Sequence, residues 1–140
     1  MKFEDFIKSG QVRKAKLDIS LAKSLLNKAK SDREFFDTIL LTELSARKLV
    51  SNYYDILRSI LETIAALNGY KIYGHEAFTY YLKILEEDNL SVKFDRLRII
   101  RNKINYYGKD VQISEAEDYI KELKEIADAL INKYLKHLRE

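Results

Sequence analysis

Residues 52–69 have the sequence NYYDILRSILETIAALNG, and this stretch decides the fold class. Its apolar side chains recur every three or four residues, the spacing of one face of an α-helix, at Tyr54, Leu57, Leu61 and Ile64. Asn68-Gly69 closes the stretch with two residues that tolerate the left-handed conformation found at helix ends. We therefore predict a long amphipathic helix that ends at about Leu67.

Helical spacing continues toward the N-terminus. Residues 11–30 place apolar side chains on one helix face, at Val12, Ala15, Ile19, Ala22, Leu26 and Ala29. Ser31-Asp32 interrupts the pattern, and Ser31-x-x-Glu34 has the form of a capping box. We predict one helix over 11–30 and a second that starts at this box and runs to Leu67.

Toward the C-terminus the sequence predicts three more helices. Residues 70–74 form a short connector to a helix over 75–85, and a helix capped by Ser91 then runs to about Tyr107, where Gly108 ends it. The apolar stripe of that helix is Leu97, Ile100, Ile104 and Tyr107. Ser114-x-x-Glu117 has the form of a capping box for a last helix to Leu138. Since no strand pattern is found, we predict an all-α, up-and-down bundle of four to five helices.

Composition limits the possible classes of protein. The chain has 140 residues and 46% hydrophobic residues, which suits a single domain, residues 1–140, with a working core. No apolar run approaches the ~20 residues of a membrane span, and the charged N-terminus is unlike a signal peptide. Cysteine is absent and histidine occurs twice, so we expect a cytoplasmic protein without disulfides, metal sites or cofactors.

Positive charge is concentrated in two segments, although the whole chain carries only +3. Residues 1–30 hold eight Lys/Arg against three Asp/Glu, and residues 92–109 hold six against one, so each segment has a net charge of +5. The two segments would form one basic patch if the fold brings them together, or they are separate solvated helix faces.

The sequence RIIRNKINYYGK, residues 98–109, contains the candidate site. On a helix, Arg98, Arg101 and Asn105 share a stripe, and Asn102 lies one turn from Arg98. Arginine offers a planar fork of donors to phosphate, asparagine binds phosphate or base edges, and tyrosine stacks on bases. The candidate phosphate- or nucleotide-binding residues are Arg98, Arg101, Asn102, Asn105 and Tyr107.

A structural interpretation of the same residues stays open. The arginines can pair with carboxylates of a neighbouring helix, and Tyr106 and Tyr107 can be core residues with a wet tip. Two histidines lie elsewhere in the sequence: we expect His75 in the first turn of its helix, bonded to nearby backbone, and His137 in solvent.

Three stretches together resemble the HEPN domain family, especially its small single-domain archaeal and bacterial members. They are NYYDILRSILETIAALNGYKIYGHEAF (52–78), DRLRIIRNKINYYGKDV (95–111) and the helix with SEAEDYIKELKEIADAL. The resemblance implies a homodimeric bundle of four to five helices. It also implies metal-independent ribonuclease chemistry and, in toxin–antitoxin pairs, a minimal nucleotidyltransferase as partner.

The family motif is an arginine followed after four to six residues by a histidine, the arginine holding the scissile phosphate and the histidine moving a proton. Here the fifth residue after Arg101 is Tyr106, and the seventh after Arg98 is Asn105, so neither register contains a histidine. Loss of general acid–base help costs on the order of 10²–10⁴ in rate, and tyrosine, with a pKa near ~10, replaces it poorly.

We therefore expect a non-catalytic, dimeric HEPN-like module that binds RNA, a nucleotide or a partner minimal nucleotidyltransferase. One alternative is a weak metal-independent endoribonuclease that uses Arg101, with Tyr106 or a rearranged His75 moving the proton. The other is a structural adaptor for protein interactions, in which the polar stripe serves packing alone.

Overall fold

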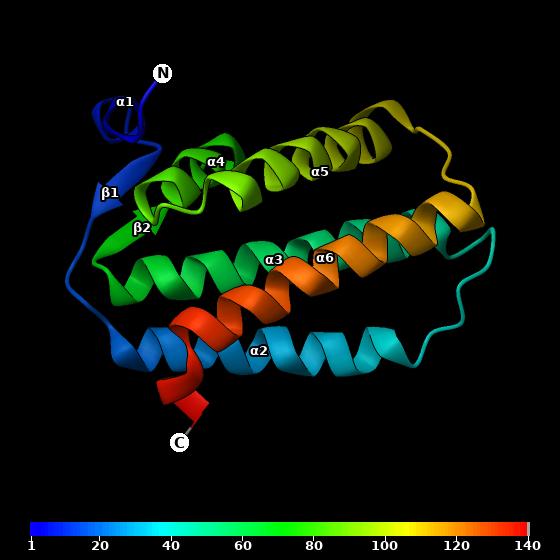
Figure 1. Cartoon of the computed structure of the whole chain (residues 1–140), viewed down its shortest axis with the longest axis horizontal. Helices are drawn as coiled ribbons and strands as arrows, with labels where there is room; N and C mark the ends of the chain where they lie inside the picture. The colour runs from blue at the N-terminus through cyan, green and yellow to red at the C-terminus, as the bar shows by residue number, and fades with distance from the viewer. Residues whose placement is uncertain (140) are drawn as a thin grey trace.

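The computed structural model describes residues 1–139 and confirms an all-α helical bundle (Figure 1). The described chain forms six α-helices rather than four or five, a two-stranded antiparallel sheet and a final 3-10 turn. The elements are α1 (Phe3–Lys8), β1 (Val12–Lys14), α2 (Ile19–Asp37), α3 (Ala46–Leu67), β2 (Tyr70–Ile72), α4 (His75–Ile84), α5 (Asp88–Tyr107), α6 (Ile113–Tyr134) and η1 (Lys136–Arg139). None of the described helices is long and apolar enough to cross a membrane.

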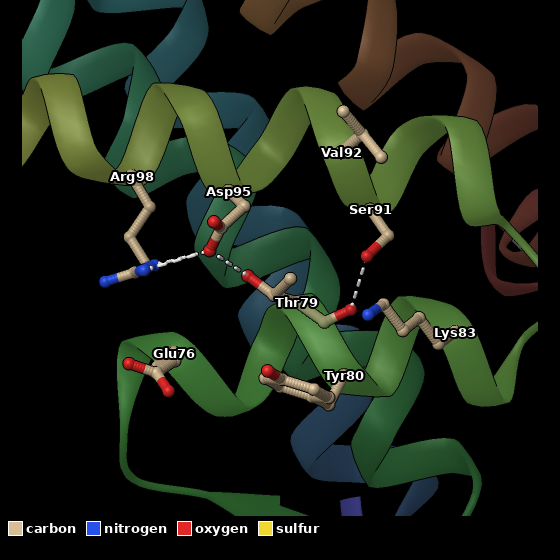
Figure 2. A pocket seen from close by; sticks show the side chains of 8 residues that line it. All are labelled: Glu76, Thr79, Tyr80, Lys83, Ser91, Val92, Asp95 and Arg98. Carbon is tan, nitrogen blue, oxygen red and sulfur yellow. Dashed lines mark hydrogen bonds and ion pairs between the residues drawn. The ribbon is translucent and has the colours of Figure 1, made fainter. Parts of the chain in front are cut away.

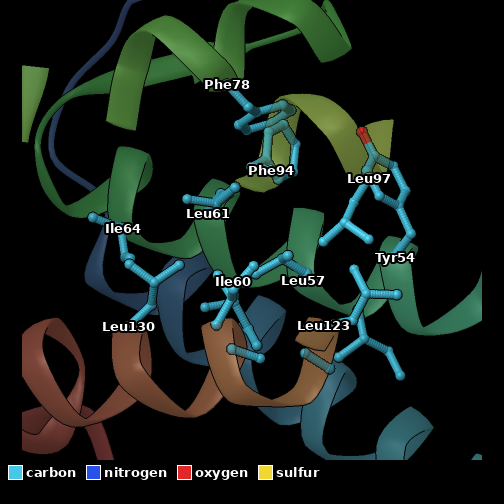
Figure 3. Close-up of a cluster of buried hydrophobic side chains, with 14 of the residues drawn as sticks. Tyr54, Leu57, Ile60, Leu61, Ile64, Phe78, Phe94, Leu97, Leu123 and Leu130 are labelled. Carbon is cyan, nitrogen blue, oxygen red and sulfur yellow. The ribbon is translucent and has the colours of Figure 1, made fainter. Parts of the chain in front are cut away.

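Helix α3 lies at the centre of the bundle, because most of its circumference is apolar. It packs against α2 and α6 and also contacts α5, β2 and α4. Its buried side chains meet those of α4, α5 and α6 in one cluster (Figure 3), which includes Tyr54, Leu57, Ile60, Leu61, Ile64, Phe78, Phe94, Leu97, Leu123 and Leu130. Since burial of one such side chain contributes about 1.5–3 kcal/mol, this cluster is the main stabilising feature of the fold.

The first helix boundary differs from the predicted one. Helix α2 begins at Ile19, capped by Asp18, which accepts a hydrogen bond from the backbone N–H of Leu21 at 2.9 Å. It then continues through Ser31-Asp32 to Asp37. The predicted capping box at Ser31 is therefore wrong, and the chain turns instead at residues 38–45.

A short two-stranded antiparallel sheet, which we call the β1–β2 ribbon, was missed by the sequence pattern. Strand β1 pairs antiparallel with β2, inside the segments predicted as helix 11–30 and as a connector. The approach of the two segments depends on Gly69, whose φ is +82° and where an added Cβ would lie 3.1 Å from the carbonyl oxygen of Ala15. Three-residue strands are too short to show a period of two in the sequence.

Helices α4 and α5 are antiparallel neighbours of unequal length, ten and twenty residues. Ser91 is not a cap: it is buried within α5, and its hydroxyl donates to the carbonyl oxygen of Thr79 at 2.8 Å. Gly108, with φ of +64°, ends α5 as predicted. The second half of α5 extends beyond α4 (Figure 1).

The last helix also begins differently from the prediction. Its capping box joins Gln112 and Glu115 rather than Ser114 and Glu117, and α6 ends at Tyr134 instead of Leu138. Leu138 still packs into the core, from the 3-10 turn.

Candidate functional site

The candidate residues of α5 point in different directions. A helix turns by about 100° per residue, so Arg98 and Asn105 lie within about 60° of Arg101 on the α3–α4 side of α5. Tyr106 lies about 140° round the helix from Arg101. It is 72% exposed and Tyr107 is 82% exposed, so neither is a core residue and Tyr107 is not part of the apolar stripe. The structure therefore separates Tyr106 from Arg101 within one chain.

Arg101 is largely buried between α5 and α3. Its guanidinium lies over the ring of Tyr54, 5.4 Å from the centroid, and donates one hydrogen bond to Asp55 at 3.3 Å. Its Nε is buried and has no acceptor among the described residues. Arg101 thus has the carboxylate partner on a neighbouring helix that the structural interpretation expects, but most of its hydrogen-bonding capacity is unused.

His75 contacts the same tyrosine, Tyr54, as Arg101 does, although it is distant from both in sequence. It is the first residue of α4, and its ring stacks on that of Tyr54 with centroids 5.8 Å apart. The Tyr54 hydroxyl lies 3.1 Å from His75 Nδ1, so the two form a hydrogen bond whose donor is set by the imidazole tautomer. The expected backbone-bonded histidine is thus instead bonded to a side chain.

The environment of His75 favours the neutral imidazole. Burial lowers the pKa of His75, and the positive charges of Arg58 and Arg101 lower it further. Burial also raises the pKa of Tyr54, whose hydroxyl therefore stays protonated. The result is a neutral histidine, held through Tyr54 beside the guanidinium of Arg101.

Arg98 is held on the other side of this cluster, facing the cleft between α4 and α5 (Figure 2). Its Nε and Nη2 both donate to Asp95 Oδ1, at 3.0 and 2.9 Å, and the same oxygen accepts from the hydroxyl of Thr79 at 3.0 Å. The pairing is with its own helix, three residues back, instead of with a neighbouring helix. Arg98 is therefore more fully neutralised than Arg101.

The sequence prediction missed three residues of the cluster, all on α3. Arg58 forms an ion pair with Glu62 at 2.5 Å and lies 4.0 Å from Asp55, so Asp55 is shared by two guanidinium groups. Burial raises the pKa of Glu62. Their signal was a polar stripe at helical spacing on an otherwise apolar helix, and it includes Lys48, Asn52, Asp55, Arg58 and Glu62.

Where α4 does not cover α5, an open groove of about 690 Å³ lies between α3 and α5. Its lining is Leu44, Arg47, Lys48, Ser51, Asn52, Asp55, Ile104 and Asn105. Asn105 is placed here by Ser51, whose hydroxyl donates to its Oδ1 at 3.0 Å. Asn102 is half-buried and has no hydrogen-bond partner among the described residues. We call this surface the α3–α5 groove.

The chemistry available is that of cations, amides and one imidazole. Among residues 1–139 no group of three or more His, Cys, Asp and Glu side chains is placed to hold a metal ion. His137 is exposed in the 3-10 turn, far in sequence from the cluster. The groove offers donors to an anion, and the neutral His75 offers one proton-transfer group near Arg101.

Comparison with known proteins adds no identity: no family model, curated protein or solved structure matches this chain.

Proposed function

We propose that the chain is a HEPN-like module that binds RNA, through phosphate, in the α3–α5 groove without robust catalysis. The supporting observation is the state of Arg101, which makes a single 3.3 Å hydrogen bond, to Asp55, a residue that lines the groove together with Arg47 and Lys48. A planar guanidinium with unused donors suits a phosphate oxygen pair.

Charge in the groove favours an anion. Among the described residues that line it, Asp55 is the one with a carboxylate, and it is shared by Arg58 and Arg101. Arg47 and Lys48 form no ion pair with a described residue. An incoming phosphate would add the second partner that Arg101 lacks. Asn52 and Asn105 add amide groups that can donate to phosphate or to a base edge.

The position of the family histidine supports binding rather than catalysis. Tyr106 occupies it five residues after Arg101, but its side chain is exposed on another side of α5. Asn105, the other candidate, has an amide that cannot exchange a proton near neutral pH and is bonded to Ser51.

A weak metal-independent endoribonuclease is the second candidate, favoured by the contact between His75 and Tyr54 beneath Arg101. In such a reaction the ribose 2′-oxygen attacks phosphorus, the 5′-oxygen leaves, and one proton moves off the first and one onto the second. A neutral imidazole beside a phosphate-binding arginine can accept the proton of the 2′-hydroxyl as a general base, and the imidazolium so formed can then donate a proton to the 5′-oxygen.

One experiment separates these candidates. A labelled single-stranded RNA is incubated with chelator and protein, and retention is read by mobility shift and cleavage on a denaturing gel. We expect retention without cleavage, with Arg101→Ala weakening it about tenfold or more. The matched control is Lys103→Ala, which removes the same charge from an exposed position of α5 on another face.

Cleavage lost in both Arg101→Ala and His75→Ala would establish the ribonuclease candidate instead. Equal retention by wild type and Arg101→Ala would contradict phosphate binding and favour the adaptor. A homodimer and a minimal nucleotidyltransferase partner remain predictions that derive from the resemblance to HEPN domains.

A further inference from the structure

The outward face of the β1–β2 ribbon is basic and aromatic. Val12 and Ile72 pair across the strands and are buried, so their neighbours Arg13 and Lys71, also a cross-strand pair, point to solvent. Tyr73 follows β2 and is 53% exposed, with the Arg13 guanidinium and the Lys71 ammonium each 5.7 Å from its ring centroid.

This arrangement is unfavourable for the chain alone. Like charges directly opposite one another in an antiparallel pair are destabilising. Neither Arg13 nor Lys71 forms an ion pair with a carboxylate of the described residues, although Glu62 is near enough to feel the charge of Lys71. Two cations that flank an exposed ring and form no ion pair with a described residue suit a ligand that is both anionic and planar.

Beside this face a cleft of about 670 Å³ is lined by residues of β2, α2 and α3. Apolar side chains line one part of it, among them Leu21, Leu25, Ala66 and Ile72. Its polar lining includes Lys16, Arg58 and Glu62, and the rings of Tyr70 and Tyr73 also border it. Rings and aliphatic side chains beside cations match an unstacked base with its phosphate.

The cleft is connected to the α3–α5 groove by two links. Arg58 lines the cleft and lies 4.0 Å from Asp55, which lines the groove. Tyr73 and Gly74 lead directly into His75, which contacts Tyr54 beneath Arg101. Lys16 of the basic segment 1–30 and Arg101 of the basic segment 92–109 therefore lie near the same stretch of α3, residues 55–58.

We propose that a single strand of RNA runs from the α3–α5 groove into the cleft beside the β1–β2 ribbon, with a base stacked on Tyr73 and phosphate on Arg13 and Lys71. This inference rests on the proposed function and specifies its ligand as single-stranded RNA. A duplex keeps its bases stacked inside, whereas this surface offers its ring and apolar lining to an exposed base.

Length-dependent binding tests the proposal. Fluorescence anisotropy is measured with 4- and 12-nucleotide single-stranded RNAs, a 12-base-pair duplex and ATP. For the 12-mer we expect Arg13→Ala/Lys71→Ala to weaken binding about tenfold and to reduce the salt slope by about 1.4, ~0.7 for each lost phosphate contact. Binding of the 4-mer, which fits the groove, should depend on Arg101 and hardly on Arg13 and Lys71.

Matched variants separate stacking from charge. Tyr73→Leu should weaken 12-mer binding about tenfold, whereas Tyr73→Phe keeps the ring and the affinity. Lys121→Ala/Lys136→Ala removes two exposed charges from α6 and the turn after it and should bind like wild type. Thermal melts of each variant establish that the fold is retained.

Each failure has its own signature. If Arg101→Ala weakens binding of both oligomers and the substitutions at Arg13, Lys71 and Tyr73 weaken binding of neither, the RNA strand does not reach the β1–β2 ribbon and the proposed function stands. If Arg101→Ala leaves 4-mer binding unchanged, the proposed function is wrong. If ATP binds with the affinity of the 12-mer and its binding depends on Arg13 and Lys71, the site is a nucleotide pocket and the strand inference is overturned. Equal binding of the duplex and the single strand would also overturn the strand inference.

Discussion

Tyr54 is the residue that joins the end of α5 to the start of α4. Its ring lies under Arg101 and stacks on His75, while its hydroxyl bonds to that histidine. Tyr54 itself belongs to the apolar stripe of α3 and is fully buried, so the packing of the core fixes the geometry of the cluster. A site residue can thus be held in place by the same side chain that stabilises the bundle.

The pH dependence of stability follows from the lowered pKa of His75. Below its unfolded-state pKa of ~6.5 the unfolded chain takes up a proton that the folded chain resists, so unfolding becomes easier as pH falls. We expect the free energy of unfolding in urea to decrease from pH 7 to pH 5.5. His75→Gln should flatten this decrease, and the exposed His137→Gln should not.

A decrease of the same size in His75→Gln and wild type would mean that other groups carry it. Glu62 works in the opposite direction at lower pH, because burial raises its pKa and the folded chain holds its proton more firmly.

At the residue scale, the sequence predicted which residues share a helix face better than it predicted which side chains they contact. It placed Arg101 and Asn105 on one side of α5, and a contact of Arg101 with a carboxylate of another helix was an open alternative. It could not identify Asp55 as that carboxylate, nor bring in His75, because both contacts depend on how α3, α4 and α5 pack. Tyr106 was a candidate through spacing along the motif alone.

At the scale of elements, the largest error concerns the turn before α3. Ser31-x-x-Glu34 has the expected residue types for a helix start, but the chain starts α3 through Thr42 and Ser45. The backbone N–H of Ser45 donates to the Thr42 hydroxyl at 3.2 Å, and that of Thr42 donates to the Ser45 hydroxyl at 2.9 Å. This reciprocal pair lies in the turn that leads into Ser45, the N-cap residue of α3, whose side chain makes no cap hydrogen bond, so the capping-box motif does not describe it.

Substitutions at Thr42 and at Ser31 compare how much the observed and the predicted helix start each contribute to the free energy of unfolding. Thr42→Ala removes the hydroxyl that accepts from Ser45, so we expect a loss of about 1 kcal/mol in the free energy of unfolding. Ser31→Ala falls on an exposed position inside α2, where alanine is the better helix former, and should leave stability within about 0.5 kcal/mol of wild type. Urea denaturation of the two variants checks this, and the reverse order would contradict the boundaries of α2 and α3.

Some elements were predictable because they repeat over many residues. The long apolar stripes of α3 and α6 and the glycine after α5 have local causes, and the all-α class followed from them. The β1–β2 ribbon has no such signal: β1 and β2 are three residues each, and they pair because α3 returns the chain beside residues 12–14.

At the scale of the whole molecule, apolar side chains remain exposed at one end of the bundle. The 38–45 turn lies at the end where α5 passes to α6 (Figure 1). Leu44 in this turn is 97% exposed and Leu40 is 79% exposed, while Phe35 at the end of α2 is 61% exposed. Leu44 also lines the α3–α5 groove, so a second copy that covers it would lie beside the proposed RNA site.

Light scattering during size-exclusion chromatography tests the homodimer. We expect wild type to have twice the mass of the 16.5 kDa chain and Leu44→Asp to shift toward the monomer, because a charge there would be buried without a partner. Ile84→Asp is the matched control, since Ile84 is 55% exposed at the end of α4. A wild-type monomer, or equal dissociation by both variants, would contradict an interface at Leu44. If Leu44→Asp is a folded monomer, its affinity for single-stranded RNA then shows whether one chain suffices for the groove or whether two copies must meet there.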